Sequence, residues 1–340
     1  MIKPLIICGI LSVAFIGCSK DKDDPKPPAT GGGGNGGGGV YAGSVMEKID
    51  NTEGLDSFSV AAAYIGLDDK LVKEGNLTVF APSNQAFELF LDARGASHIS
   101  ALSPEILAHE LNYHVGTTQL KKANFAGVQY MKTFDENGPN GNSVMIQLVT
   151  KNGDTKVSNQ YALNEPEISG NNGVIHIVNR IFTKPTVSDF INNDERLANL
   201  NTLFKKDPPS YFKEFNSGDG GRLVTFFGPT NEAFDDFINK NPLYNSLNDI
   251  DYAHIPSVLN IQAVGGSTTP LNLRTEDIED NQVIQTWEIT NGKLTFKVSE
   301  NDVITIKTPN PSQQEINFVE ENLQASNGVL HIIDAVVTNQ

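Results

Sequence analysis

Two spacings of apolar residues divide the chain into predicted helices and predicted strands. Apolar residues recur at intervals of three and four near Ser57–Lys73, Asn84–Asp92 and Pro104–His114, which predicts helices with one buried face. Apolar, β-rich runs near Val144–Thr150 and Val174–Phe182 predict buried strands. Helices and strands are therefore both expected to contribute to the core.

Two segments of the chain recur later in the same order. Phe80–Phe87 (FAPSNQAF) returns as Phe227–Phe234 (FGPTNEAF), 147 residues further on. Asn172–Val178 (NGVIHIV) returns as Asn327–Ile333 (NGVLHII), 155 residues further on. A repeat of about 150 residues is the size of a domain and too long for one unit of a solenoid, so the sequence predicts a tandem duplication.

The first repeated segment predicts a strand that leads into a helix. Leu77–Phe80 and Leu223–Phe226 are β-rich runs, and the proline that ends each of them cannot continue a hydrogen-bonded ladder. The hydroxyl of Ser83 or Thr230 can then cap a helix. Each helix places apolar residues on one stripe: Ala86, Phe87 and Phe90 in the first copy, and Ala233, Phe234 and Phe237 in the second.

The second repeated segment predicts a tight turn followed by a buried strand. Asn-Gly favours a turn, and apolar residues follow it almost without interruption. His176 and His331 lie inside these apolar runs. A single histidine in such a strand is typical of a core residue, so both are predicted to be structural, with an edge contact as the alternative.

The repeated segments resemble the two marks of the fasciclin-domain family, a TVFAPTNEAF-like first box and an NGVIHVID-like second box. Both boxes occur twice and at the right separation. The resemblance implies an α+β fold of two tandem fasciclin-like domains, each a wedge-shaped β-sandwich with several short helices packed around it. It places domain 1 at 44–184 and domain 2 at 185–340.

The family often carries a Tyr-His pair between its two boxes, and Tyr113 and His114 stand at that place. The second copy has Ile261 and Gln262 there instead. The resemblance implies a ligand contact, because the Tyr-His region of animal members has been linked to integrin binding. The residues themselves favour a plainer role, in which both rings end a helix, are buried and hydrogen-bond within the domain.

The first residues predict export and a lipid anchor. Residues 5–17 are almost all apolar, and thirteen helical residues span only about 20 Å, short of the roughly 30 Å hydrocarbon core of a membrane. A signal peptide is therefore predicted over 1–17. It ends at Cys18 in a sequence that looks like a bacterial lipobox, which implies lipidation of Cys18; ordinary secretion is the alternative.

A hydrophilic segment, 18–43, separates the predicted anchor from the first domain. Ser19–Asp24 is acidic and resembles the tag with which Bacteroidota-type bacteria place lipoproteins on the outer membrane, facing the cell exterior. The alternative is a solvated tether that carries no localisation signal. The glycine-rich run Gly31–Gly39 is expected to be flexible and to hold the folded body away from the membrane.

Composition narrows the classes of partner. Lys and Arg number 25 against 41 Asp and Glu, a net charge of −16, so nucleic acid is not expected as a partner. Both cysteines, Cys8 and Cys18, lie in the first eighteen residues. That position excludes a disulfide framework and a cysteine metal site in the folded part.

No catalytic or cofactor motif has the spacing that its chemistry needs. His109 and His114 lie five residues apart, about 140° around a helix, so they cannot share zinc as an i, i+4 pair would. Adjacent carboxylates such as Asp235 and Asp236 point to different faces and indicate a solvated acidic surface. No cofactor and no metal are predicted, with a loosely held calcium ion as the alternative.

Aromatic residues mark two candidate binding positions. Copy two has a long stretch, 205–222, before its first box, and loops that lengthen on a rigid scaffold often bind ligands. Tyr211 and Phe212 are candidates for an exposed aromatic platform, although a small helix packed by them is the favoured interpretation. Trp287 is a candidate for stacking on a sugar, although its β-rich surroundings favour a core position.

We therefore expect a non-enzymatic, surface-anchored adhesion or binding lipoprotein that recognises an extracellular protein or a matrix glycan. The alternative is an accessory glycan-capture protein of an outer-membrane polysaccharide uptake system. An enzyme would need carboxylates or histidines that are distant in sequence to meet in one cleft. No oligomeric state is predicted.

Overall fold

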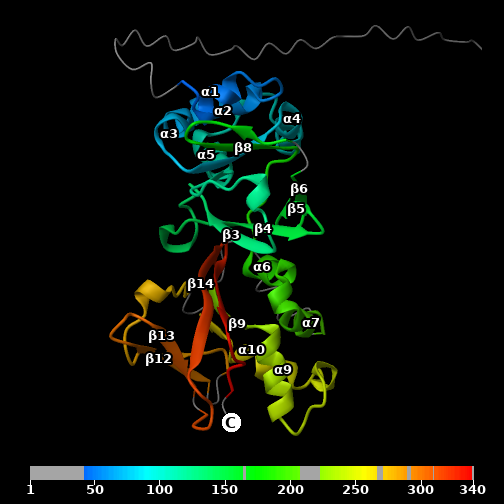
Figure 1. Cartoon of the computed structure of the whole chain (residues 1–340), viewed down its shortest axis with the longest axis vertical. Coiled ribbons are helices and arrows are strands. Elements are labelled where there is room, and N and C mark those ends of the chain that lie inside the picture. The colour runs from blue at the N-terminus through cyan, green and yellow to red at the C-terminus, as the bar shows by residue number, and fades with distance from the viewer. Residues whose placement is uncertain are drawn as a thin grey trace, which may run out of the picture. The chain divides into compact units, whose positions relative to one another are not determined.

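The computed structural model describes residues 42–163, 166–206, 223–265, 271–288, 292–308 and 310–338 (Figure 1). Residues 1–41, which include the predicted signal peptide, Cys18 and most of the predicted tether, lie outside these residues. Within the described ranges, no helix combines the length and the apolar character that crossing a membrane requires. The elements form two copies of one arrangement, which we call copy one (α1 to β8) and copy two (α6 to β15).

Copy one begins with helices and ends with strands. Its helices are α1 (Val45–Asp50), α2 (Asp56–Ile65), α3 (Leu67–Lys73), α4 (Asn84–Ala93) and α5 (Pro104–Tyr113), with short 3-10 turns η1 (Ile99–Ala101), η2 (Lys122–Asn124) and η3 (Pro139–Gly141). Its strands are β1 (Leu77–Pro82), β2 (Val115–Gly116), β3 (Val128–Lys132), β4 (Met145–Lys151), β5 (Asp154–Val157), β6 (Tyr161–Ala162), β7 (Ile168–Ser169) and β8 (Gly173–Val178).

Copy two repeats this order. Its helices are α6 (Val187–Asn193), α7 (Ala198–Lys206), α9 (Asn231–Lys240) and α10 (Ile255–Asn260), with 3-10 turns η4 (Glu195–Leu197), η5 (Leu247–Asp249) and η6 (Thr275–Asp277). Its strands are β9 (Val224–Pro229), β10 (Ala263–Gly265), β11 (Val283–Gln285), β12 (Lys293–Val298), β13 (Ile304–Lys307), β14 (Ile316–Ala325) and β15 (Gly328–Ile333).

The two repeated boxes pair with each other at the centre of each copy. β1 runs parallel to β8, from Leu77 opposite Gly173 to Pro82 opposite Val178. β9 runs parallel to β15 in the same way. The serine or threonine after each proline caps the next helix as predicted, because the Ser83 and Thr230 hydroxyls accept from the backbone N–H three residues on.

The helical pattern predicted near 57–73 is divided between two helices. Gly66 ends α2 in the left-handed conformation, with φ at 72°, and α3 starts at the next residue. Glycine adopts that conformation without the steric penalty of a Cβ atom. The apolar spacing continues through the break because α2 and α3 both pack on the same core, which hides the break from a periodicity count.

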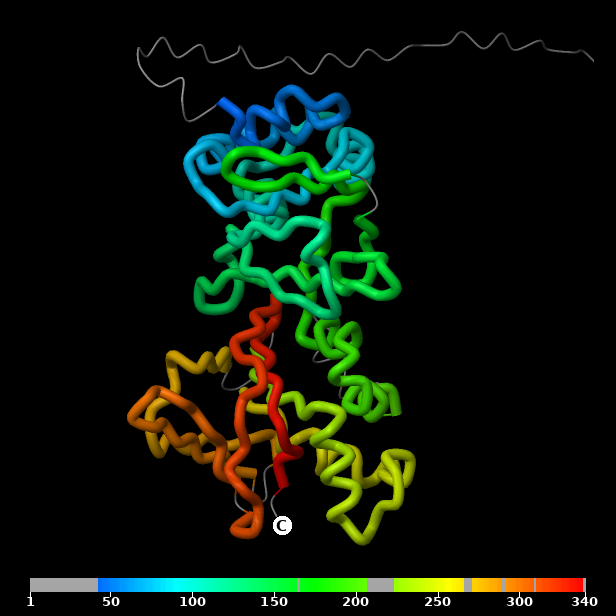
Figure 2. The backbone as a smooth tube through the Cα atoms, in the orientation of Figure 1, coloured from blue at the N-terminus to red at the C-terminus, as the bar shows by residue number. Residues whose placement is uncertain are grey.

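The sheets differ between the copies. Copy one has two four-stranded sheets, in the orders β2-β1-β8-β7 and β3-β4-β5-β6. Copy two has one seven-stranded sheet, because the ten-residue β14 pairs with β15 along one part and with β13 along another. Figure 2 shows β14 and β15, in orange and red, running side by side. The mixture of short helices and sheets confirms the predicted α+β class.

An asparagine ties the last strand of each copy to its first helix. The Asn172 side chain accepts from the Val45 N–H at 2.8 Å, and Asn327 accepts from the Val187 N–H at 2.9 Å. The glycine after each asparagine is needed for space, because a Cβ at Gly173 or Gly328 would meet the carbonyl of the neighbouring parallel strand. The Asn-Gly pair therefore makes the predicted turn and also closes the domain.

The two copies touch through polar groups and a shared apolar cluster. The Tyr130 hydroxyl on β3 donates to the buried Asp194 carboxylate at 3.0 Å. The Gln147 amide on β4 donates to that hydroxyl at 2.8 Å and to the Phe190 carbonyl at 3.1 Å. Met145, also on β4, belongs to the apolar core of copy two. The first residues of copy two are thus fastened to a sheet of copy one.

Candidate functional site

The Tyr-His pair at the end of α5 is fully buried. His114 lies between the two boxes of copy one, where its Nδ1 donates to the Phe80 carbonyl at 2.8 Å and its Nε2 accepts from the Phe182 N–H at 2.9 Å. Its ring stacks on Phe182 with 4.2 Å between centroids. Burial lowers the pKa of His114 to about 4, so the ring is neutral at pH 7 and can keep its acceptor nitrogen. Tyr113 is equally buried, and its hydroxyl donates to the Met145 carbonyl at 3.3 Å.

Gln262 does in copy two what His114 does in copy one. Its amide nitrogen donates to the Val337 carbonyl at 3.1 Å, and its amide oxygen accepts from the Val337 N–H at 3.4 Å. Val337 and Phe182 both follow the last strand of their copy, 155 residues apart. The backbone of each position bonds alike as well, since the His114 and Gln262 carbonyls accept from the Phe80 and Phe227 N–H groups. The side chain at position 114 therefore stabilises the fold by holding the segment after the last strand in place.

His176 and His331 hold a loop against the central strands, as their apolar surroundings predicted. The Nε2 atoms of His176 and His331 lie 3.1 and 2.9 Å from the carbonyls of Leu120 and Leu273. Their rings stack on Phe80 and Phe227 of the first box. Burial lowers the pKa of His331 to about 4 and lowers that of His176. Both imidazoles are core residues that bond the backbone of their own domain.

Charged groups gather beside α5, and no pattern in the sequence predicted that they would meet. The Asp135 carboxylate is buried, with Lys184 Nζ at 2.6 Å and His109 Nδ1 at 3.8 Å. Glu110, one residue from His109, pairs with Arg94 at 2.6 Å, although burial raises its pKa. Each carboxylate has its own cation, so the cluster is a structural ion-pair network rather than a proton-transfer pair. Asp135 lies in a polar run without periodicity, which is why no pattern marks it.

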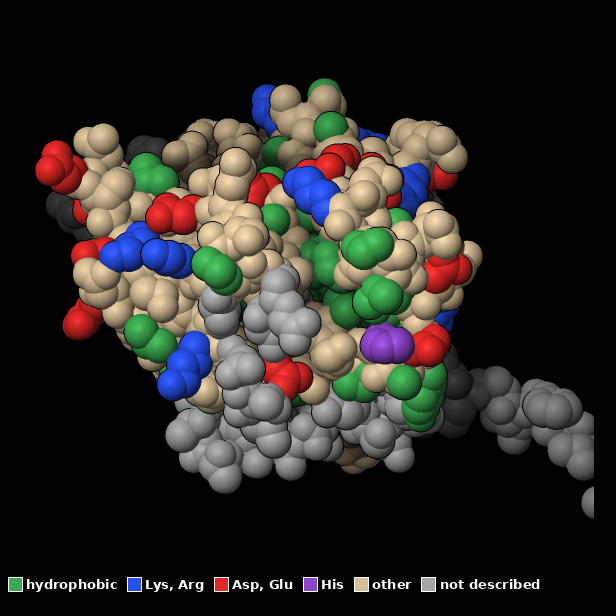
Figure 3. Space-filling view, turned by 90° about the horizontal axis from the view of Figure 1, so that it is seen from below, with side chains coloured by type: hydrophobic (Ala, Val, Ile, Leu, Met, Phe, Trp, Pro, Cys, Tyr) green, Lys and Arg blue, Asp and Glu red, His purple; other side chains and the backbone are tan. Residues whose placement is uncertain are grey.

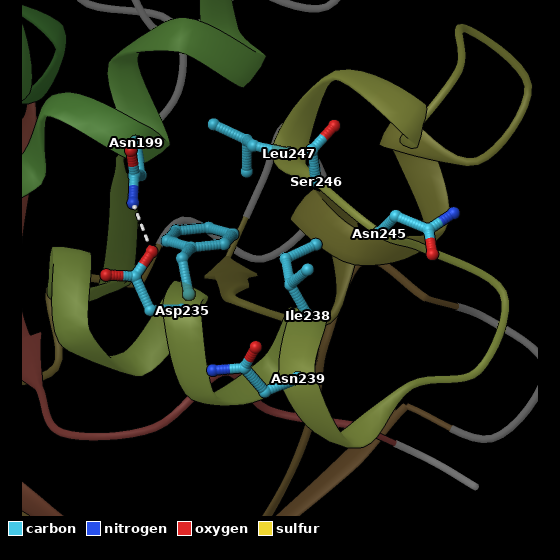
Figure 4. Close-up of a pocket in the computed structure, with 8 residues that line it drawn as sticks. Asn199, Asp235, Ile238, Asn239, Asn245, Ser246 and Leu247 are labelled. Carbon is cyan, nitrogen blue, oxygen red and sulfur yellow. Dashed lines mark hydrogen bonds between the residues drawn. The ribbon is translucent and has the colours of Figure 1, made fainter.

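A polar hollow of about 380 Å³ opens in copy two between α7, α9 and the segment that leads into η5 (Figure 4). Asn199 lines it from α7, and Asp235, Ile238 and Asn239 line it from α9. Ser246 and Leu247 line the facing side. Figure 4 shows the Asn199 amide directed at Asp235, at 3.4 Å, across the gap between the two helices. Sequence reasoning did not bring these residues together, because their contact depends on loop geometry.

The sequence model of the fasciclin domain matches residues 53–184 and 196–339, most of the chain. The chain belongs to the fasciclin domain family. The resemblance of the two boxes is thus confirmed, and copies one and two are a tandem pair of fasciclin domains. Proteins with fasciclin domains are generally non-enzymatic adhesion proteins.

Relatives of this fasciclin chain include much longer animal proteins. The transforming growth factor-beta-induced protein ig-h3 of Sus scrofa is 26% identical over 164 residues, 48% of this chain and 22% of that protein. Periostin of Homo sapiens is 28% identical over 154 residues, 44% of this chain and 17% of that protein. The matches thus span about a fifth of the length of these relatives. A FAS1 domain pair from the insect cell adhesion molecule fasciclin I aligns with a TM-score of 0.49 and 14% identity, over 87% of this chain and 97% of that one.

The aromatic candidates of the second fasciclin domain differ in what the structure describes. Tyr211 and Phe212 lie outside the described residues. Trp287 is half-buried; its indole N–H donates to the Gly265 carbonyl at 2.7 Å and its ring packs against the core. An indole held in this way is anchored to its own domain. The burial of Tyr113 and His114 likewise favours their structural interpretation over a ligand contact.

The described residues bring no three potential metal ligands together in a metal-binding group. His109 is half-exposed beside Asp135, whereas His114 is buried between backbone groups, so the two rings are engaged separately. Of the features described above, the polar hollow of copy two is the one that offers open surface to a ligand.

Proposed function

We propose that this chain is a non-enzymatic, lipid-anchored surface protein that binds an extracellular protein or a matrix glycan. Membership of the fasciclin family supports a binding role. The observation that carries the proposal is the engagement of the buried histidines: His114, His176 and His331 all bond backbone groups of their own domain. These histidines, whose side chains could otherwise serve acid–base chemistry, thus stabilise the fold. Recognition of a partner is left to surface residues.

The proposed location depends on the N-terminal sequence. Cys18 would carry the lipid, and the acidic run Ser19–Asp24 would direct the protein to the outer membrane, facing the cell exterior. A flexible segment of about 25 residues has an average reach of roughly 25–30 Å. That reach would let the domain pair meet partners beyond the membrane surface.

Surface charge agrees with a protein or neutral glycan partner rather than a polyanion. The chain carries a net charge of −16. In the space-filling view, acidic and basic side chains are scattered among neutral ones over the face drawn, without a large basic patch (Figure 3). A polyanion would need clustered Lys and Arg.

Binding is tested with a soluble fragment, residues 41–340, which contains every described element. The fragment is applied to a mixed array of extracellular-matrix proteins and polysaccharides. Selective retention by one class supports the proposal and names the class. Retention by neither class contradicts it.

The anchor is tested separately in cells that carry the full chain. Labelled palmitate should enter the wild-type protein and not a Cys18→Ala variant, and the variant should leave the membrane fraction. Protease added to intact cells should cleave the anchored protein if it faces outward. An unlabelled wild-type protein would contradict lipidation, and protection from protease would contradict surface exposure.

A second candidate function is glycan capture beside an outer-membrane uptake system. The acidic tag and the polar hollow of copy two favour this function. Trp287 does not add to this evidence, because its indole is bonded to the Gly265 carbonyl of its own domain. This function predicts slower growth of cells lacking the chain when a polysaccharide is the sole carbon source. Equal growth on every polysaccharide bound by the fragment would exclude it.

A further inference from the structure

The polar hollow exists in copy two at a place that copy one builds differently. An asparagine at the start of each first-box helix marks the equivalent positions, because Asn84 accepts from the Ser57 N–H and Asn231 accepts from the Asn199 N–H, both at 2.9 Å. Asn199 thus stands where copy one has Ser57. Likewise, Asp235 on α9 stands 147 residues after Glu88 on α4.

The opposite wall of the hollow also differs between the copies. In copy one, η1 packs against α2, and the Tyr64 hydroxyl of α2 donates to the Leu102 carbonyl at 3.4 Å. In copy two, the corresponding tie is the long side chain of Lys206, whose Nζ lies 3.5 Å from the Leu247 carbonyl. The walls at this place are thus held together by different residues in the two copies.

The polar atoms of the hollow suit a ligand that both donates and accepts hydrogen bonds. Asn199 contributes an amide whose nitrogen already bonds Asp235. Across the described part of the chain, neither the second carboxylate oxygen of Asp235 nor the Asn239 amide has a partner. An amide offers both a donor and an acceptor, and a carboxylate accepts only, so together they match adjacent hydroxyl groups.

The charge and the apolar residues of the hollow further restrict the chemical class of the ligand. Among the described residues that line the hollow, Asp235 alone is charged, which disfavours an anionic ligand. A purely apolar ligand would give the amides no hydrogen-bond partners and is therefore disfavoured. Ile238 and Leu247 provide apolar contact on the two sides. The ligand must therefore combine hydroxyl groups with an apolar C–H face.

We propose that the hollow of copy two is a binding site for a neutral saccharide, with Asp235 and Asn239 bonding adjacent hydroxyl groups and Ile238 and Leu247 packing on the C–H face of a sugar ring. This inference rests on the proposed binding function and narrows it to one ligand class and one domain. The volume of about 380 Å³ lies in the range of roughly 300–1,000 Å³ found for small-molecule clefts.

The test uses the 41–340 fragment and defined neutral oligosaccharides: maltohexaose, cellohexaose, xylohexaose, mannohexaose and galactohexaose. Calorimetric titration identifies any that bind. Asp235→Ala and Asn239→Ala should each weaken binding about tenfold or more, because each removes a hydrogen bond that the ligand cannot replace. Glu88→Ala and Asp92→Ala, the matched positions 147 residues earlier in copy one, should leave binding unchanged.

Each outcome decides between the inference and the broader function. Oligosaccharide binding that survives both α9 variants, or that is lost in the α4 controls instead, overturns the site. If the same fragment binds only matrix proteins on the mixed array, the saccharide inference fails while the binding function stands. If it binds neither class, both fail. Fluorescence of Trp287, the only tryptophan, confirms that the variants of copy two remain folded.

Discussion

The two copies meet one structural need with different residues. Copy one ties its last segment to the centre with the His114 imidazole, and copy two does so with the Gln262 amide. Both side chains reach a backbone N–H just after the last strand. The comparison shows that a histidine at a motif position can be kept for its hydrogen-bonding geometry alone. It also shows why residue type was a poor guide to function at this position.

Elsewhere the copies keep the same residues for the same reason. The hydroxyls of Thr78 and Thr225, 147 residues apart, each accept from the N–H of a leucine, Leu120 or Leu273. His176 and His331 hold the same loop from its other side. The centre of the domain is thus fixed, whereas the α2–η1 and α7–η5 surfaces diverge. Divergent surfaces on a fixed centre are where a specific ligand site is expected.

The largest losses of unfolding free energy should come from replacing the glycines that let the parallel strands approach each other. Gly173→Ala and Gly328→Ala would each push a Cβ against a backbone carbonyl that cannot move without disturbing the sheet. We expect each to cost about 3 kcal/mol of unfolding free energy. Gly75→Ala is the control, because nothing lies near its Cβ and its φ is not positive. Urea unfolding measures all three, and a neutral Gly328→Ala would contradict the close approach.

The next largest losses of unfolding free energy should come from replacing His114 or Gln262, which bond the segment after the last strand. His114→Ala and Gln262→Ala would each leave buried backbone groups without partners, and we expect a loss of about 2–3 kcal/mol. His114→Gln should cost only about 1 kcal/mol, because Gln262 shows that an amide can fill this role. Thermal unfolding of the 41–340 fragment measures all three variants. Unchanged stability of His114→Ala together with lost ligand binding would restore the contact interpretation of this residue.

Acid should weaken copy one more than copy two. The pKa of His114 is lowered by burial to about 4, against about 6.5 when unfolded. Between these values the unfolded state takes up a proton that the folded state does not, so stability is full above pH ~6.5 and falls as the pH drops toward ~4. His176 adds to this effect in copy one, whereas copy two has His331 and the non-titrating Gln262.

The acid comparison is measured by urea unfolding at pH ~7 and pH ~5, conditions on the two sides of most of this titration. Trp287 fluorescence reports copy two, and hydrogen exchange of the β1 amides reports copy one. Equal destabilisation of both copies would contradict the neutral, buried state of His114. His114→Gln should remove part of the difference between the copies.

The smallest effect should come from the contact between the copies. Tyr130→Phe removes the hydrogen bonds of the hydroxyl with Asp194 and Gln147 and keeps the ring contact with Phe190. We expect a loss of about 1 kcal/mol, because Arg196 still pairs with the Asp194 carboxylate at 2.6 Å. Tyr161→Phe, which removes an exposed hydrogen bond to Thr183, is the control. Hydrogen exchange of α6 amides should rise in Tyr130→Phe alone.

The sequence predicted those parts of the fold in which local chemistry repeats. The strand–proline–cap order at Ser83 and Thr230 and the buried strand at β8 follow from side-chain pattern and backbone propensity. The break at Gly66 did not, since the apolar stripe continues across it. Periodicity registers which face is buried and not where the backbone turns.

The candidate site was predicted only in part, for a related reason. The burial of His176 follows from its apolar neighbours along the strand, but the hydrogen bond of Trp287 to Gly265 joins residues 22 positions apart. The hollow needs Asn199, Asp235 and Leu247 from three elements, and no spacing in the chain relates them. Contacts across loops depend on loop conformation, which the pattern of residues does not determine.

The hydrogen bond between the first helix and the asparagine before the last strand of each copy has a consequence for the order of folding. Val45 and Asn172 lie 127 positions apart, and Val187 and Asn327 lie 140 apart, yet each pair bonds directly beside a parallel strand pair. Contacts of such long range form late, because loop-closure entropy is lost before they are made. A domain of this kind cannot close until its final box has been synthesised. A chain that must cross a membrane before folding would thereby stay open long enough to be threaded through.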